Sequence, residues 1–438
     1  MRAYFDKLAE CLQDSLKPGE IFTCYFAAEE SDFVRLNKNR VGQAGHVRQL
    51  TVDIDLINGL KHAPGVADLS GNIDDDRRAL APLIDRLRSQ RATLEDDPHL
   101  LYATNVQCTE AVHDNTLPAS NDAIQQIVDA GQGLDLVGIW VSGPLYRGFA
   151  NSLGQRNWYQ NASFMFDWSC YVKKDRAVKS NYAGVTWHAD ELHGRMRAAR
   201  EQLETLGKTP KSISPGKYRS YIAPAALQEL IGMVNWGGFG LKSHRTRQTP
   251  LLQMIDGDRR LHPAISISEA TAVGLAPAFT ASGFIKPSRV SLIDGGQYKD
   301  CLVSPRSARE YDVPVNAGSE FPESLDMAAG DIDETHVADM LGNGLWLSNL
   351  WYCNFSDRSK CRITGMTRYA CFWVEDGKLA SPINAMRFDE SIYRTLGTEL
   401  AGLTRERQHL LSANTYGSRS TSSMRLPGAL TGSLTLTL

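Results

Sequence analysis

The sequence Tyr221-Ile-Ala-Pro-Ala-Ala-Leu-Gln-Glu-Leu-Ile-Gly-Met-Val-Asn-Trp236 joins the end of a strand to the start of a helix. Pro224 suits the first helical turn, because the N–H that proline lacks would have no partner there. Four apolar residues recur at helical spacing and predict one buried face, namely Leu227, Leu230, Ile231 and Val234. On composition alone this is an ordinary buried helix, so the function of its other side chains must be argued from the rest of the chain.

The chain has 438 residues, of which 42% are hydrophobic and 22% charged, and a formal net charge of −3. This length exceeds that of one compact core and predicts two domains. The composition is typical of a soluble globular protein, and the net charge gives no reason to expect a nucleic-acid or membrane partner. No apolar run is long enough to span a bilayer. The N-terminus has no signal-peptide core and the 8 cysteines form no Cys-x-x-Cys pair, so we expect a cytoplasmic protein with reduced thiols.

The first half of the chain alternates helical and extended patterns. Apolar spacing predicts helices over residues 2–16, 73–97, 121–130 and 189–206. Alternating or apolar runs predict strands over residues 21–28, 32–43, 50–56, 134–144 and 158–172, with a turn over 148–154. These elements predict an N-terminal domain, residues 1–212, in which helices pack on a mixed sheet.

The second half is dominated by short strands and turns. Residues 290–302 predict a hairpin around Gly295-Gly296, residues 346–355 a further strand, and residues 426–438 a last strand. Turn-forming residues 212–216 place the domain boundary, so that residues 213–438 form a curved, mostly antiparallel β domain. The predicted fold class is therefore α+β with two domains.

Several segments in this order resemble the TldD/PmbA (TldD/TldE) family of metallopeptidases. They are Gly-Phe-Ala-Asn-Ser-Leu-Gly (148–154), the segment 206–218, the Pro-Ala-Ala helix, the hairpin over 290–302, and Gly365 to Gly377 with its Phe-Trp-Val-Glu-Asp-Gly ending. The resemblance covers nearly the whole chain. It implies the two-domain fold predicted above, and it implies a dimer that encloses an active site and holds an unfolded peptide as an added strand.

The resemblance also identifies where catalytic family members bind zinc. In those members the helix carries His-Glu-x-x-x-His, in which the histidines bind zinc and the glutamate is the general base. The matching positions here are Gln228, Glu229 and Met233, so the glutamate is kept and both histidines are replaced. The third ligand in catalytic members is a cysteine near the C-terminus, but this chain has no cysteine after Cys371, and Tyr416 is the nearest equivalent. An amide and a thioether are poor zinc ligands, so we expect no metal in this chain.

The resemblance therefore implies a TldE/PmbA-like, non-catalytic subunit that holds peptide while a TldD-like partner supplies zinc. Without a metal-bound water, Glu229 is either a solvated or paired helix carboxylate or a residue that positions peptide. One alternative is a homodimeric, peptide-binding pseudoenzyme. Another is an active metallopeptidase with unorthodox ligands such as His188, His193 or His244.

Three other features have simpler interpretations. His188 and His193 are five residues apart, and on a regular helix this spacing separates their side chains by about 140°, so a metal site there is not expected. The basic segment 242–247 predicts a solvated loop, with a loop lining a peptide channel as the alternative. Trp346, Trp351 and Trp373 are expected in the core, and no Gly-x-Ser-x-Gly elbow indicates a serine hydrolase.

Overall fold

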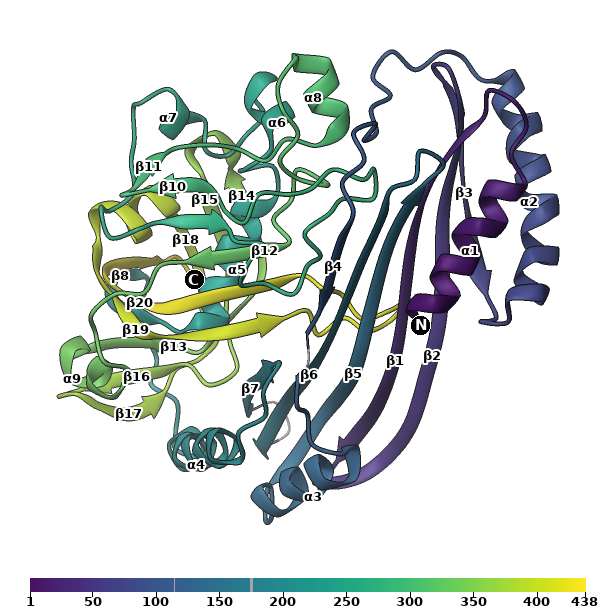
Figure 1. Ribbon diagram of the computed structural model, residues 1–438. Helices are drawn as coiled ribbons and strands as arrows, with labels where there is room; N and C mark the ends of the chain where they lie inside the picture. Colours follow the sequence, from purple (N-terminus) through teal and green to yellow (C-terminus); the bar gives the residue numbers. More distant parts are fainter. Residues whose placement is uncertain (114, 174–175) are drawn as a thin grey trace.

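The computed structural model describes residues 1–113, 115–173 and 176–438, and its strands form two sheets (Figure 1). Among these residues the first sheet has seven strands: β1 (Ile21–Asn37), β2 (Arg40–Asn58), β3 (Lys61–Leu69), β4 (Thr109–Val112), β5 (Asp135–Asn151), β6 (Arg156–Lys173) and β7 (Arg176–Gly184). Their spatial order is β3-β2-β1-β5-β6-β4, with β7 also paired to β6. The strand β4 runs parallel to β6 and the other neighbours are antiparallel, so the predicted mixed sheet is confirmed.

Four helices pack on this sheet: α1 (Arg2–Asp14), α2 (Ile73–Thr93), α3 (Ser120–Ala130) and α4 (Ala189–Leu206). Phe5 of α1 and Leu83 of α2 bury against Phe26, near the start of β1. Farther along, α3 and α4 bury apolar residues against Trp140 and Trp168. The helices therefore cover the two ends of the long strands, and the four predicted helices are present, with ends that differ by a few residues.

The second sheet is built from the second half of the chain. Its strands are β8 (Gly216–Ile222), β9 (Ile267–Glu269), β10 (Val290–Asp294), β11 (Gln297–Tyr298), β12 (Ser324–Met327), β13 (Gly344–Leu347), β14 (Asn349–Asp357), β15 (Arg362–Arg368), β16 (Phe372–Glu375), β17 (Lys378–Pro382), β18 (Arg387–Ser391), β19 (Leu400–Leu411) and β20 (Ser423–Leu436). The main spatial order is β11-β10-β9-β12-β20-β8-β13-β16-β17, and the remaining strands β14, β15, β18 and β19 join beside it.

Most neighbours in this sheet are antiparallel; β12 with β20 and β8 with β13 are parallel. The helices of this half are α5 (Pro224–Asn235), α6 (Leu241–Arg245), α7 (Leu252–Ile255), α8 (Pro305–Tyr311) and α9 (Val337–Leu341). The helix α5 contributes its apolar face to the main core of this half, and the predicted α+β fold is confirmed. None of the helices in the described parts of the chain is long and apolar enough to cross a bilayer.

Two local predictions in the first half were wrong. Residues 32–43 do not form one strand, because β1 runs unbroken from Ile21 to Asn37 and β2 starts at Arg40. Lys38 and Asn39 between them have φ values of 50° and 55° and make a two-residue hairpin turn. The segment 148–154 is not all turn, because residues 148–151 end β5. A Cβ on Gly148 would lie 2.8 Å from Cζ of Phe5, so this glycine permits close packing of α1.

The strand predicted over residues 346–355 is also divided in the structure. Its first part belongs to β13 and its second to β14, with Ser348 between them. The hairpin predicted over residues 290–302 is present as β10 and β11, and Gly295 and Gly296 both have positive φ in its turn. Glycine adopts positive φ readily, which explains why this turn was readable from sequence.

The two halves meet at α4, where Phe372 joins the apolar cluster of α3 and α4, and on the face of the first sheet opposite α1. Phe279 packs with Phe149 and Tyr159 of that sheet. The loop 412–422 between β19 and β20 reaches to the first sheet, seen as the yellow chain that extends toward β5 and β1 in Figure 1. There Gln49 of β2 donates a hydrogen bond of 2.8 Å to the carbonyl oxygen of Gly417. The C-terminal hairpin therefore ties the second half to the first.

Candidate functional site

The helix α5 is fixed on the second sheet by its first turn and by its apolar face. The N–H of Ala223, directly before the helix, donates a 3.0 Å hydrogen bond to the carbonyl oxygen of Leu347 in β13. Pro224 occupies the first helical turn, as the sequence predicts. The four residues of the predicted apolar face are all buried: Leu227, Leu230, Ile231 and Val234. The backbone of the candidate site is therefore rigidly held.

The three candidate site residues lie outside this apolar face. Gln228 and Met233 are half-buried, whereas Glu229 is exposed. Because a regular α-helix has 3.6 residues per turn, positions 228 and 233 are separated by about 140° around the axis. Gly232 between them has open space where a Cβ would lie. The helix by itself does not bring the two side chains onto one line.

The carboxyl group of Glu229 has an environment that favours its neutral form. Among the described residues no side-chain hydrogen bond or ion pair reaches it. Although the side chain contacts solvent, the surrounding protein raises the pKa of Glu229 by desolvation. Burial raises the pKa of Cys353 on β14 to about 12, and the charge of Glu229 contributes to that rise. A neutral thiol and a carboxyl group thus lie near one another beside α5.

The donor atoms at this site do not fit a catalytic zinc ion. Such a site needs about three imidazole, carboxylate or thiolate ligands and an open position for water. Gln228 offers an amide oxygen, Met233 a thioether, and Glu229 the one carboxyl group of the three. Within residues 1–113, 115–173 and 176–438 there is no group of three or more His, Cys, Asp or Glu residues arranged to hold a metal ion.

The other histidines considered from the sequence are placed apart from α5. His188 directly precedes α4 and His193 lies within it, and both side chains are exposed. His244 is half-buried, and one ring nitrogen, Nε2, lies 2.7 Å from the carbonyl oxygen of Gly238. Burial lowers the pKa of His244, so the ring is neutral near pH 7. The segment 242–247 was predicted as a loop, but Lys242 to Arg245 belong to α6.

Tyr416 is not brought to α5. It lies in the loop 412–422, its side chain is 100% exposed, and the next residue binds Gln49 of the first sheet. Figure 1 shows this loop beyond the ends of β19 and β20, where it extends away from α5 to the first sheet. The sequence-based equivalence of Tyr416 to a zinc-binding cysteine is therefore not supported by its position within this chain.

One prediction about the tryptophans was wrong. Trp346 and Trp373 are half-buried, but Trp351 is 52% exposed and the neighbouring Tyr352 is 73% exposed. Tyr352 has a φ of 55°, and the pairing of β14 with β15 shifts register at this place. This irregularity turns Trp351 outward, where the guanidinium of Arg368 lies 5.1 Å from its ring centroid. Alternation in the sequence cannot reveal such a bulge.

The cleft nearest to α5 was not predicted. It has a volume of about 800 Å³ and lies where the N-terminus of α5 approaches β7, α4 and β19. Its residues come from distant segments: 178–181 of β7, 191–202 of α4, 223–225 at the start of α5, 333–335, and 406–408 of β19. Although the side chain of Glu334 in this cleft contacts solvent, desolvation by the surrounding protein raises its pKa; the charge of Arg195 lowers it and that of Glu406 raises it. No sequence signal joins these segments, because the fold alone brings them together.

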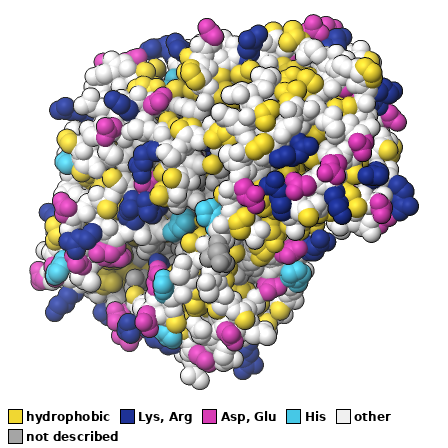
Figure 2. Space-filling view, viewed as in Figure 1, with side chains coloured by type: hydrophobic (Ala, Val, Ile, Leu, Met, Phe, Trp, Pro, Cys, Tyr) yellow, Lys and Arg dark blue, Asp and Glu magenta, His cyan; other side chains and the backbone are white. Residues whose placement is uncertain are grey.

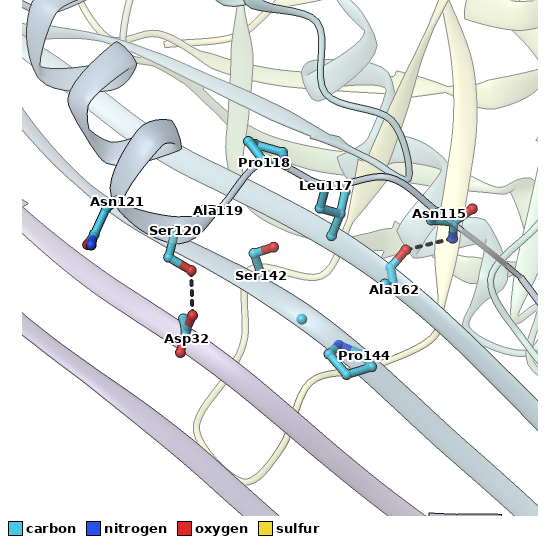
Figure 3. Close-up of a pocket in the computed structure, with 11 residues that line it drawn as sticks. Asp32, Asn115, Leu117, Pro118, Ala119, Ser120, Asn121, Ser142, Pro144 and Ala162 are labelled. Atoms are coloured by element: carbon cyan, nitrogen blue, oxygen red, sulfur yellow. Dashed lines mark hydrogen bonds between the residues drawn. The ribbon is translucent and has the colours of Figure 1, made fainter.

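A second cavity, of about 590 Å³, lies between the start of α3 and strand β5 (Figure 3). Ser120 donates a hydrogen bond to Asp32, and His46 lies 2.8 Å from the same carboxylate. Those two contacts hold the pKa of Asp32 below its ordinary value. Because Asp32 is already paired, the cavity offers no free reactive group, and α5 does not line it.

Comparison with known proteins gives a consistent result. Residues 215–437 match the family of the PmbA/TldA metallopeptidase C-terminal domain. TldE from Thermococcus kodakarensis superposes with a TM-score of 0.79 at 12% identity, covering 99% of this chain and 100% of that one. A proposed modulator of a DNA gyrase from Thermotoga maritima gives 0.73 at 13% identity, covering 100% of both chains. A similarly described protein from Bacteroides thetaiotaomicron superposes with a TM-score of 0.73 at 14% identity, covering 99% of this chain and 98% of that one.

At these identities the structural likenesses show the fold alone. A search of curated proteins gives no match. The matched C-terminal region contains α5 and therefore the whole candidate site, apart from the part of the cleft formed by β7 and α4.

Proposed function

The chain belongs to the TldD/PmbA metallopeptidase family, and on this premise we propose that it is a non-catalytic, TldE-like subunit of a cytoplasmic TldD/TldE-type zinc peptidase. In this role it binds unfolded peptide for processing, while a TldD-like homologue carrying His-Glu-x-x-x-His supplies zinc and the activated water. One observation carries the proposal: the helix that bears the zinc ligands in catalytic members is intact here, but bears Gln228 and Met233 at the histidine positions.

Peptide binding is supported by the cleft beside α5. Two strands that line it have an unpaired stretch of edge among the described residues. The strand β7 is paired along one edge, with β6, whereas β19 is paired with β20 along one edge and with residues 330–332 on the part of the other edge around Thr404. An extended peptide can add to such an edge through main-chain hydrogen bonds, which do not depend on the peptide's sequence. This mode suits a protein that accepts unfolded chains of varied composition.

The isolated chain is expected to contain no stoichiometric zinc, because the site offers an amide and a thioether in place of two imidazoles. Elemental analysis of protein purified without chelators measures this directly. Stoichiometric zinc that disappears in His188→Ala or His193→Ala would instead establish an unorthodox metal site. Loss of zinc in His244→Ala would lead to the same conclusion for a site at His244.

Co-purification from the native cells tests the complex itself. The untagged protein is expected to elute with a homologue that carries His-Glu-x-x-x-His, and zinc should follow that partner in the assembly. Elution as a zinc-free dimer of this chain alone would favour the peptide-binding pseudoenzyme instead. Mass spectrometry of the intact complex distinguishes the two assemblies.

Glu229→Gln should leave peptidase activity of the reconstituted complex nearly unchanged. A general base contributes roughly 10²–10⁴-fold to the rate, but only beside a water that it can activate. Glu95→Gln, at an exposed position outside the cleft, is the matched control. If Glu229→Gln reduced kcat by that factor while assembly stayed intact, Glu229 would have a catalytic role.

A further inference from the structure

Three arginines converge on one buried carboxylate on the second sheet. Asp326 of β12 accepts hydrogen bonds from Arg425 Nε at 2.7 Å, Arg407 Nη1 at 2.9 Å and Arg289 Nη2 at 3.1 Å. The Asp326 side chain is only 6% exposed. Arg289 also donates to the hydroxyl of Ser268 at 2.7 Å. We call Arg289, Arg407 and Arg425 the arginine cluster.

The cluster belongs to a polar row across neighbouring strands. The register pairs Asp326 with both Ser268 and Arg425, and pairs Arg425 with His409. Directly paired residues point to the same face of a sheet, so these side chains share one face. Figure 2 shows Lys or Arg side chains and His side chains at the edge of a hollow near the middle of the viewed face, where Figure 1 has β19 and β20.

The charges in the cluster do not balance. Three guanidinium groups face one carboxylate, and the charges that act on the pKa of Arg407 are those of Asp326 and of the other two arginines. Burial lowers the pKa of Arg407 and Arg425 lowers it further, whereas Asp326 opposes the change. Burial lowers the pKa of His409 too, and so does the charge of Arg425, so this ring stays neutral. An excess of positive charge in a partly buried place favours binding of an anion.

The arginines also have donors left for a ligand. Arg425 uses Nε for Asp326, and Arg407 uses Nη1 for Asp326 and for the carbonyl oxygen of Met327. Some buried polar side-chain atoms of the described residues have no hydrogen-bond partner, but the remaining nitrogens of Arg407 and Arg425 are not among them. These N–H groups therefore reach solvent. Arg407 is the one member of the cluster that lines the 800 Å³ cleft at the start of α5, and it connects the cluster with that cleft, whose lining also includes the carboxyl groups of Glu334 and Glu406. Asp326 thus holds the guanidinium groups in place while part of each stays open.

We propose that the arginine cluster binds a carboxylate of the peptide that occupies the cleft, its C-terminal group in particular. This inference rests on the proposed function, because it takes a peptide as the ligand. The fork of a guanidinium matches the two oxygens of a carboxylate, and each of the three arginines contacts Asp326 through a single nitrogen, so the other nitrogens remain for a second carboxylate. Inorganic phosphate presents the same kind of oxygen atoms, so it serves as a competitor in the test. The cluster would then set which end of a peptide the cleft prefers.

The test compares two fluorescently labelled peptides without Asp or Glu that differ only in a free or amidated C-terminus. In fluorescence anisotropy, the full-length protein should bind the free acid about tenfold more tightly, as expected for one charge-assisted contact. Inorganic phosphate should compete with the free acid alone. Arg289→Gln, whose side chain is 55% exposed, should reduce the preference without affecting folding, and Arg289→Gln/Arg425→Gln should abolish it. Arg405→Gln removes a charge from the same strand outside the cleft and should keep the preference.

Each remaining outcome has a separate meaning. Equal affinity for both peptides would overturn the inference and leave peptide binding intact. Binding of neither peptide, by the isolated chain or by the complex, would overturn the proposed function and this inference together. A preference for the free acid that survives in Arg289→Gln/Arg425→Gln would place the carboxylate site elsewhere. Displacement of both peptides equally by phosphate would show that the arginine cluster does not recognise the C-terminal carboxylate.

Discussion

Arg419→Ala is expected to lower the free energy of unfolding by about 3–5 kcal/mol, since it removes one partner from a buried charged network. Arg419 lies in the loop 412–422 and is only 7% exposed. Its guanidinium donates to the hydroxyl of Ser31, to the carbonyl oxygen of Gly143, and to both oxygens of Ser163. These acceptors belong to β1, β5 and β6, so one side chain fastens the C-terminal hairpin to three strands of the first sheet.

The loss of stability in Arg419→Ala is expected to come mainly from the buried polar groups that would lose Arg419 as a partner. Glu29 is buried beside Arg419, and it accepts hydrogen bonds from Gln49 and from the hydroxyl of Ser31. Burial lowers the pKa of Arg419 to about 10 and the charge of Glu29 raises it, which indicates that each charge compensates the other only in part. Without Arg419, the Glu29 carboxylate would stay buried and would lose the charge of that guanidinium.

Urea unfolding followed by circular dichroism measures the effect. Arg86→Ala, an exposed position on α2, is the control and should change stability by less than about 0.5 kcal/mol. Adding Glu29→Gln to Arg419→Ala should recover part of the loss, because the unpaired charge is gone. Limited proteolysis should cut the loop 412–422 sooner in Arg419→Ala. Stability equal to that of Arg86→Ala, with an uncut loop, would show that other contacts hold the hairpin.

The parts of this fold that could be predicted from sequence are those fixed by neighbours in the chain. The helices α4 and α5 have apolar residues at helical spacing, and the hairpin of β10 and β11 has two glycines at its turn. Such patterns depend on residues a few positions apart, so a single sequence contains them. The assignment of Gln228 and Met233 to the histidine positions of catalytic members also rests on residues within one helix, and it stays a prediction.

What could not be predicted depends on contacts between distant segments. Arg419 lies 390 positions from Glu29 in the chain, and nothing in either local sequence indicates that they meet. The arginine cluster draws on residues 289, 407 and 425, which become neighbours only through the register of the second sheet. Tyr416 was matched to a metal-binding cysteine by its order in the chain, but the hairpin carries it to the first sheet. Its order in the sequence indicates the loop in which it lies, but not the part of the fold that this loop reaches.

Introducing two histidines, in Gln228→His/Met233→His, is expected to create a weak zinc site on α5, where we propose that the native chain binds none. The two imidazoles would flank Glu229 in the sequence, and the spacing of five residues requires a local adjustment of the helix, for which the conformational freedom of glycine at position 232 is suited. Cys353 is the thiol whose pKa responds to Glu229, so it is the nearest candidate for a further ligand. Binding releases the thiol proton, which opposes the reaction because burial favours the thiol. The free energy of zinc binding should therefore be smaller in magnitude than the roughly 10–16 kcal/mol of complete structural zinc sites.

Competition with a chromophoric chelator measures that affinity, and Gln228→Ala/Met233→Ala is the matched control without imidazoles. Adding Cys353→Ser to the histidine variant should weaken binding, whereas adding Tyr416→Cys should leave it unchanged, because Tyr416 lies against the first sheet. If Tyr416→Cys tightened binding instead, the loop 412–422 would have to leave its contacts with Gln49 and Ser163 in solution. If the folded histidine variant bound zinc no better than its alanine control, α5 would have lost more than two ligands. The pocket itself would then have been remodelled, and a simple replacement of metal ligands could no longer explain this chain.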